Sequence, residues 1–186
     1  MGLHPYDLLI VLGIVEVALA LTKRTRSPRR RSDHGSLLTL WLVIAVSVAF
    51  AILFAMTARP GMIGPSRWLM FSSLGSFALG IALRWWAILH LGRWFTVDVA
   101  IQPEQRVVDD GPYRHIRHPS YTGLLLAFSG AGLLLGNWIA WSFIMVPITV
   151  AVLHRIRIEE SVLARTLGPA YTIYVSRTWR LIPFVH

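Results

Sequence analysis

The segment Leu37–Met56 reads LLTLWLVIAVSVAFAILFAM, an unbroken run of 20 residues without a charge. A helix of about 20 apolar residues spans the hydrocarbon core of a bilayer, which is about 30 Å thick. Lipid offers no hydrogen-bonding partner, so the backbone of such a segment must satisfy its own polar groups, as an α-helix does. The segment is therefore predicted to be a transmembrane helix.

Further apolar runs lie on both sides of this segment. One precedes it and three follow it: Pro5–Leu21, Trp68–Leu83, Tyr121–Leu135 and Trp138–Leu153. Ser76 and Gly80 have the small-xxx-small spacing that lets membrane helices approach closely. Gly132 and Gly136 repeat this spacing and predict a tight hairpin between the last two runs. We expect an all-α, polytopic membrane helical bundle of about five transmembrane helices.

The composition agrees with a membrane protein. Hydrophobic residues make up 55% of the chain and charged residues 15%, and the mean hydropathy is +0.57. Soluble domains average roughly 45–50% apolar and about 25% charged residues. The chain has no cysteine, which excludes disulfides, thiolate metal sites and a thiol nucleophile. We expect no metal ion in the protein.

Lys and Arg residues are concentrated in alternate links between the runs. The second link carries only Arg59 and Arg67, whereas the first link is strongly basic: Lys23, Arg24, Arg26, Arg29, Arg30 and Arg31. Short loops rich in Lys and Arg stay in the cytoplasm, which predicts an outside N-terminus and a cytoplasmic C-terminus. Attraction to anionic membrane lipids accounts for the net charge of +9 without a nucleic-acid partner. Because these charges, rather than a cleavage site, follow the first run, that run is expected to remain as an anchor.

The chain is predicted to form one domain with two parts. Residues 1–91 hold the first three transmembrane helices and the basic loop. Residues 92–186 hold the chemically active side chains, the helical hairpin and a cytoplasmic C-terminal segment that packs on the bundle. The last helix of the hairpin is expected to leave the membrane and to stop at Gly168-Pro169, because glycine and proline commonly follow a helix end.

The densest group of functional side chains is GPYRHIRHPSYTG, Gly111–Gly123. Pro119 suits the first position of a helix, whose free amides and partial positive charge attract an anion such as a carboxylate. Arg117 and His118 would reinforce this attraction. Tyr113 and Tyr121 offer rings and hydroxyls to an aromatic or ribosyl ligand. The alternative is a basic helix cap at the membrane surface.

A second group, RIRIEE, occupies Arg155–Glu160. Arg155 and Glu159 are four residues apart and share one helical face. The glutamate would hold an ammonium group, and the planar fork of Arg155 would bind an acidic acceptor. The alternative is a solvated helix end with a weak surface salt bridge. Together the two groups complement a zwitterionic ligand.

These two motifs, followed by Leu167-Gly168, Tyr171, Tyr174 and Leu181-Ile182-Pro183, closely resemble the isoprenylcysteine carboxyl methyltransferase family. A more distant resemblance is to the membrane phospholipid N-methyltransferases. The resemblance covers about Leu83 to Phe184. It implies that S-adenosylmethionine lies at the cytoplasmic mouth of the bundle, and that a lipophilic small molecule or a prenylated substrate enters sideways from the bilayer.

Carried over by position, the resemblance implies a set of cofactor-binding residues: Gln105, Arg106, Val107, Val108, Tyr113, His118, Pro119, Ser120, Tyr121 and Glu159. Arg155 would contact the acceptor carboxylate, with Arg157 as a stand-in. A carboxylate acceptor needs no general base, whereas an amine acceptor would need one, for which His118 and Glu160 are the candidates. The family's eukaryotic enzymes have a histidine at Gln105, and Thr96–Glu104 aligns only with a gap.

Other functions stay open at this point. A membrane reductase of a sterol-like lipid would need a nicotinamide cofactor, but the chain has no Gly-rich phosphate loop. A transporter or scaffold predicts polar residues at membrane depth, where Glu16 is the lone acid. The acceptor is a prenylcysteine or another isoprenoid, quinone-like or lipid acid, and the oligomeric state is open. The preference for Arg over Lys favours a bacterial inner membrane.

Overall fold

The computed structural model describes residues 6–22, 35–97 and 104–183. This part of the chain contains six α-helices and no β-strand, which confirms the all-α prediction. The helices are α1 (Asp7–Thr22), α2 (Ser36–Thr57), α3 (Arg67–Leu91), α4 (Pro119–Leu133), α5 (Trp138–Leu167) and α6 (Pro169–Arg177), with short 3-10 turns at η2 (Gly92–Trp94) and η3 (Gly111–Arg114). The basic link predicted at Lys23–Arg31 lies outside the described residues.

The first five helices occupy the five apolar runs. Among the described residues, three helical segments are long and apolar enough to cross a membrane by length and composition: α2, α3 together with η2, and α5. Large apolar side chains are exposed along α2, at Leu38, Leu42, Val46 and Leu53. Such a continuous exposed apolar face suits lipid rather than water.

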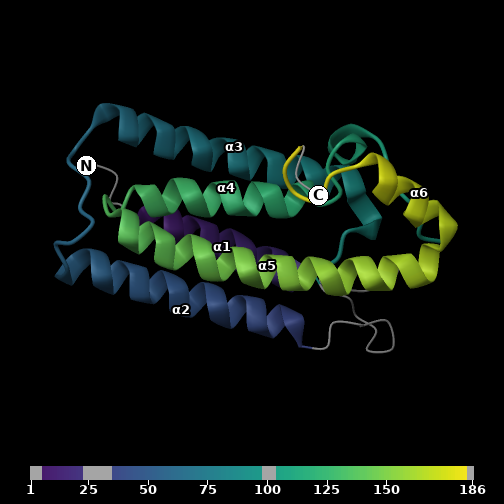
Figure 1. The fold of residues 1–186 in the computed structure, drawn as a ribbon, viewed down its shortest axis with the longest axis horizontal. Helices are drawn as coiled ribbons and strands as arrows, with labels where there is room; N and C mark the ends of the chain where they lie inside the picture. The colour runs from purple at the N-terminus through teal and green to yellow at the C-terminus, as the bar shows by residue number, and fades with distance from the viewer. Residues whose placement is uncertain (1–5, 23–34, 98–103, 184–186) are drawn as a thin grey trace.

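The helices α3 and α4 lie side by side, with α5 next to α4, α2 next to α5, and α1 behind them (Figure 1). Glycines bring α3 and α4 together: a Cβ atom added at Gly80 would lie 2.4 Å from the amide nitrogen of Ala127. The hydroxyl of Ser76 donates to the carbonyl of Leu126 at 3.0 Å. The close approach predicted from Ser76 and Gly80 is confirmed.

A tight turn joins α4 to α5. Gly136 adopts φ 64°, and a Cβ atom at Gly132 would touch side chains of α5 at 3.3 Å. The side-chain oxygen of Asn137 caps α5 by accepting from Ile139 N at 3.0 Å and Ala140 N at 3.1 Å. The predicted hairpin is therefore confirmed.

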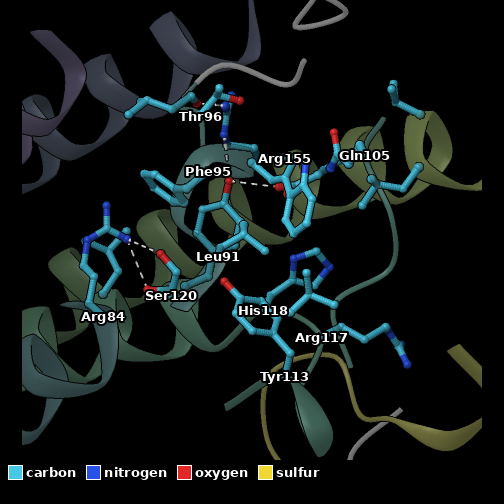
Figure 2. Close-up of a pocket in the computed structure, with 18 of the residues that line it drawn as sticks. Arg84, Leu91, Phe95, Thr96, Gln105, Tyr113, Arg117, His118, Ser120 and Arg155 are labelled. Carbon is cyan, nitrogen blue, oxygen red and sulfur yellow. Dashed lines mark hydrogen bonds between the residues drawn. The ribbon is translucent and has the colours of Figure 1, made fainter. Parts of the chain in front are cut away.

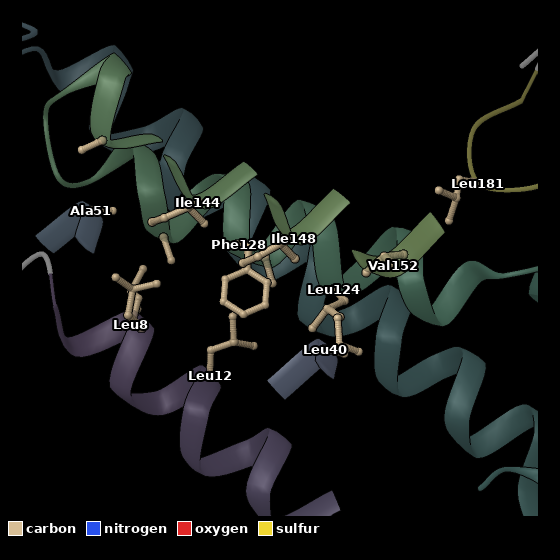
Figure 3. Close-up of a cluster of buried hydrophobic side chains, with 14 of the residues drawn as sticks. Leu8, Leu12, Leu40, Ala51, Leu124, Phe128, Ile144, Ile148, Val152 and Leu181 are labelled. Atoms are coloured by element: carbon tan, nitrogen blue, oxygen red, sulfur yellow. The ribbon is translucent and has the colours of Figure 1, made fainter. Parts of the chain in front are cut away.

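The core is an apolar cluster between α1, α2, α4 and α5, with Leu12, Leu40, Phe128 and Ile144 among its members (Figure 3). The 30 residues of α5 extend roughly 45 Å, which exceeds the thickness of a bilayer core. The helix ends where predicted, at Gly168, whose φ is 57°.

The segment after α6 packs on the end of the bundle, as predicted. Trp179 N donates to His115 O at 2.9 Å, and Arg117 N donates to Trp179 O at 2.7 Å. The hydroxyl of Thr122 donates to Leu181 O at 2.7 Å. These bonds fix the loop before α4 and the first turn of α4.

Candidate functional site

A pocket lies at the end of the bundle that carries α6. Side chains from every α-helix line it, from Glu16 on α1 to Tyr171 on α6. His118 and Glu159 both face this pocket, so the two sequence motifs meet in one site as expected. Figure 2 shows His118 and Tyr113 near the centre of the lining, with Arg84 and Arg155 on different sides.

The hydroxyl of Tyr121 joins the two charged residues of α5. It accepts a hydrogen bond from Arg155 Nε at 2.9 Å and donates one to Glu159 Oε2 at 3.2 Å. Arg155 is only 2% exposed, and its Nη1 donates to Ser36 Oγ of α2 at 2.8 Å. Its Nη2 donates to the carbonyl of Val97. A buried guanidinium and a carboxylate are thus held on one face of the pocket.

Glu160 lies at the centre of a basic cluster beside the pocket. Its carboxylate accepts from Arg117 Nε at 3.0 Å and from Arg180 Nη2 at 2.7 Å, and it lies 3.3 Å from His118 Nε2. Arg117 also donates to the carbonyls of Val175 and Thr178. This cluster ties α5 to the loop before α4 and to the C-terminal segment.

Three tyrosines, Tyr113, Tyr171 and Tyr174, line the pocket near α6. The phenol of Tyr113 donates to Ala87 O at 3.2 Å, and Tyr174 donates to Tyr113 O at 2.8 Å. Burial raises the pKa of Tyr113, as does the nearby charge of Glu159, so its phenol stays protonated. The hydroxyl of Tyr171 and Trp94 Nε1 are buried at the pocket lining without a hydrogen-bond partner in the described chain. Buried polar groups normally have a partner, and a ligand with polar atoms would supply one.

Comparison with known proteins shows which family the chain belongs to. A family model described as the isoprenylcysteine carboxyl methyltransferase (ICMT) family matches residues 73–165, half of the chain. The chain belongs to this family. The resemblance drawn from the two motifs is thereby confirmed, and the apolar helices of this ICMT family member make it a multi-pass membrane protein.

Relatives of this family member include named methyltransferases. Protein-S-isoprenylcysteine O-methyltransferase B of Arabidopsis thaliana is 34% identical over 64% of this chain and 61% of that protein. The protein-S-isoprenylcysteine O-methyltransferase of Schizosaccharomyces pombe is 32% identical over 61% of this chain and 49% of that protein. The chain thus spans about half to three-fifths of the length of these relatives.

A solved structure has the same fold as this family member. It is the structure of the eukaryotic intramembrane Ras methyltransferase ICMT, determined without a monobody. The TM-score is 0.61 and the sequence identity 25%, and the match covers 96% of this chain and 60% of that chain. Almost the whole of the described bundle therefore follows the fold of a known intramembrane methyltransferase.

The structure brings most of the predicted site residues of this ICMT family member together. Arg155 lines the pocket, and so do nine predicted cofactor-binding residues: Gln105, Arg106, Val107, Val108, Tyr113, His118, Ser120, Tyr121 and Glu159. Pro119 is buried and is not among the lining residues. Glu160 and Arg157 are not among the lining residues, and Arg157 is exposed on α5.

The predicted set of site residues left out part of the lining. Trp94 and Tyr171 carry unpartnered polar atoms, and α2 supplies an apolar wall made of Leu37, Leu40, Trp41 and Ile44. Glu16 and Arg84 also line the pocket. The signal for Glu16 was visible, since it is an acidic residue in the middle of an apolar run, but nothing in the sequence distinguishes the leucines of α2 that line the pocket from leucines that face lipid.

Proposed function

We propose that the protein transfers a methyl group from S-adenosylmethionine to the carboxylate of a lipophilic acceptor, a prenylcysteine or a related isoprenoid acid. The observation that carries the proposal is the composition of one pocket. Buried Arg155 and the carboxylate of Glu159 share a face of it, and the apolar wall of α2 adjoins them. A charged methyl donor and a hydrocarbon chain with an acidic end both fit such a lining.

The residues present fit S-adenosylmethionine. Glu159 would offer a carboxylate to its ammonium group, and His118, which lines the same pocket, would bind its carboxylate. Trp94 Nε1 and the hydroxyl of Tyr171 would gain partners among the polar atoms of its nucleoside. The cofactor supplies a methyl group that the positive charge of the sulfonium has already activated. The role of the protein is therefore to hold and align.

The acceptor carboxylate is assigned to Arg155. Its guanidinium is buried in the pocket lining, where it donates to oxygen atoms of Tyr121, Ser36 and Val97. The planar fork of arginine matches a carboxylate. An ionised carboxylate needs no base, and alignment in a site that excludes water favours the transfer. Glu160, held by basic residues, would then stabilise the site rather than react.

The placement in the membrane is part of the proposal. We infer about five membrane-crossing helices, an outside N-terminus and a pocket that faces the cytoplasm of a bacterial cell membrane. The ends of α1, α3 and α5 and the starts of α2 and α4 gather at the pocket. This matches the alternation of basic and uncharged links in the sequence.

A methyl-transfer assay tests the function directly. Full-length protein in proteoliposomes is given labelled S-adenosylmethionine and a panel of prenylcysteine analogues, isoprenoid acids and native lipids. Label in a prenylcysteine or isoprenoid ester is the expected result. A melting temperature that rises with a reduced nicotinamide cofactor and not with S-adenosylhomocysteine would instead favour a lipid reductase.

Replacing Glu159 with glutamine should weaken the binding of S-adenosylhomocysteine. The change removes a charge-assisted hydrogen bond worth about 1.5–3 kcal/mol, which corresponds to roughly 10- to 100-fold in affinity. Titration calorimetry measures the effect. Asp109→Asn is the matched control, because Asp109 is exposed and outside the pocket. An unchanged affinity in Glu159→Gln would remove Glu159 from the cofactor site.

A further inference from the structure

An ion pair lies inside the bundle between α1 and α3. Arg84 Nη2 donates to Glu16 Oε2 at 2.5 Å, and the two residues are 6% and 7% exposed. Ionisable side chains within membrane segments are costly and usually have a function. Glu16 lies outside residues 73–165, which the family model matches, so the family match gives this pair no role.

Arg84 also binds the first turn of α4. Its Nη1 donates to Ser120 O at 3.1 Å and to Ser120 Oγ at 3.0 Å, as Figure 2 shows. A Cβ atom at Gly123 would lie 2.6 Å from Arg84 N, so the two helices are in backbone contact here. Ser120 precedes Tyr121, whose hydroxyl binds both Arg155 and Glu159. Ser120 and Tyr121 thus connect the ion pair to Arg155 and Glu159, the residues that would hold the substrates.

Stability alone does not explain this pair. Glu16 Oε1 and Arg84 Nε are buried without a hydrogen-bond partner in the described residues. A buried ion pair with unsatisfied atoms is often no more stable than apolar side chains of similar volume. Both residues line the pocket. A role at the site is therefore the better explanation for charges at this depth.

We propose that Glu16 and Arg84 are positioning residues for methyl transfer to a prenylcysteine-type carboxylate. Glu16 orients the guanidinium of Arg84, and Arg84 holds Ser120. This fixes the Tyr121 hydroxyl and, through it, the side chain of Arg155. The inference rests on the proposed function, and it assigns a role in catalysis to α1. We expect the effect on the acceptor side, because the Tyr121 hydroxyl accepts a hydrogen bond from Arg155, the residue assigned to the acceptor carboxylate.

The test uses a double variant that removes both charges, Glu16→Leu with Arg84→Met, together with the single variants Glu16→Gln and Arg84→Lys. Each full-length protein is reconstituted and measured for melting temperature, affinity for S-adenosylhomocysteine, and kcat and KM with N-acetyl-S-farnesylcysteine. The double variant should melt near the wild-type temperature, because no unpaired charge stays buried. Its kcat should fall about 100-fold, the effect expected of a displacement of about 1 Å in a reacting group.

Wild-type kcat and KM in the double variant would overturn the proposal, because the pair would then have a structural role only. If the double variant does not fold, Arg84→Lys decides the question. Lysine keeps the charge beside Glu16, but its single ammonium cannot span Glu16 and both oxygens of Ser120. A lowered kcat supports the positioning role, and an unchanged kcat contradicts it.

One more measurement separates this inference from the proposed function. Hydrogen exchange of the amides in the first turn of α4 is compared in the wild type and the variants, without any substrate. Faster exchange in Arg84→Lys and in the double variant is expected, and unchanged exchange in both refutes the positioning role. Failure of the wild type to methylate any prenylcysteine or isoprenoid acid refutes the proposed function instead.

Discussion

Replacing Arg155 with alanine is expected to lower kcat/KM for a prenylcysteine carboxylate about 100-fold or more, because the acceptor loses a pair of charge-assisted hydrogen bonds worth about 1.5–3 kcal/mol each. Arg155 is buried on the pocket wall and its guanidinium reaches α4 and α2. The affinity for S-adenosylhomocysteine should be nearly unchanged, since the cofactor is assigned to other residues. Steady-state kinetics and calorimetry on the same preparation measure both quantities.

Arg157 provides the matched control for this experiment. It lies two residues further along α5, carries the same charge, and is exposed outside the pocket lining. Arg157→Ala should retain wild-type kinetics. A loss confined to Arg157→Ala would transfer the acceptor role to that residue. Equal losses of acceptor and cofactor affinity in Arg155→Ala would refute the separation of the two substrates.

The second large effect is expected from Gly80→Ala, which should destabilise the bundle. Its new Cβ atom would lie 2.4 Å from Ala127 N and 2.6 Å from Gly123 O, both backbone atoms that no rotamer change can move. The helices α3 and α4 would have to separate. Overpacking of this kind costs about 1–3 kcal/mol and occasionally more. Thermal unfolding in detergent, followed by circular dichroism, should show a lower midpoint.

Gly75→Ala is the control on the same helix. Gly75 is exposed, and an added Cβ atom there would meet nothing within 4 Å. Alanine also has the higher helix propensity, so the midpoint should stay the same or rise slightly. Equal destabilisation by the two substitutions would mean that the glycines matter for helix flexibility rather than for the close contact of α3 and α4.

Much of this fold could be predicted because lipid imposes a simple rule on sequence. An uncharged run such as Leu37–Met56 has to form a helix, and the structure has α2 at Ser36–Thr57. Glycine positions also predicted where helices end and turns begin. The turn at Gly136 and the helix end at Gly168 were both expected, and both residues have positive φ. The packing of the tail on the bundle was also expected, but its particular partners, residues 115–122, depend on tertiary hydrogen bonds that leave no periodic pattern.

The site was predictable where charge is rare. The chain has only nine acidic residues, so the adjacent pair Glu159 and Glu160 indicated a functional site. In the structure, Glu159 and His118 line the same pocket. The contacts of Glu160 with Arg117 and Arg180 could not be predicted from the motif. Only the packing of the tail brings Arg180 to Glu160. The partner of Glu16 was equally hidden, because spacing along the chain does not say which arginine a distant helix will meet.

The contacts of Arg117 set an order of assembly. Its guanidinium donates to the carbonyls of Val175 and Thr178, and its backbone amide donates to the carbonyl of Trp179. These three partners follow α5 in the chain and are therefore synthesised after it. The membrane helices can therefore insert and pair while the mouth of the protein is still unfinished. We therefore expect that a nascent chain stalled before residue 175 forms the bundle but leaves the loop that carries Arg117 without these contacts.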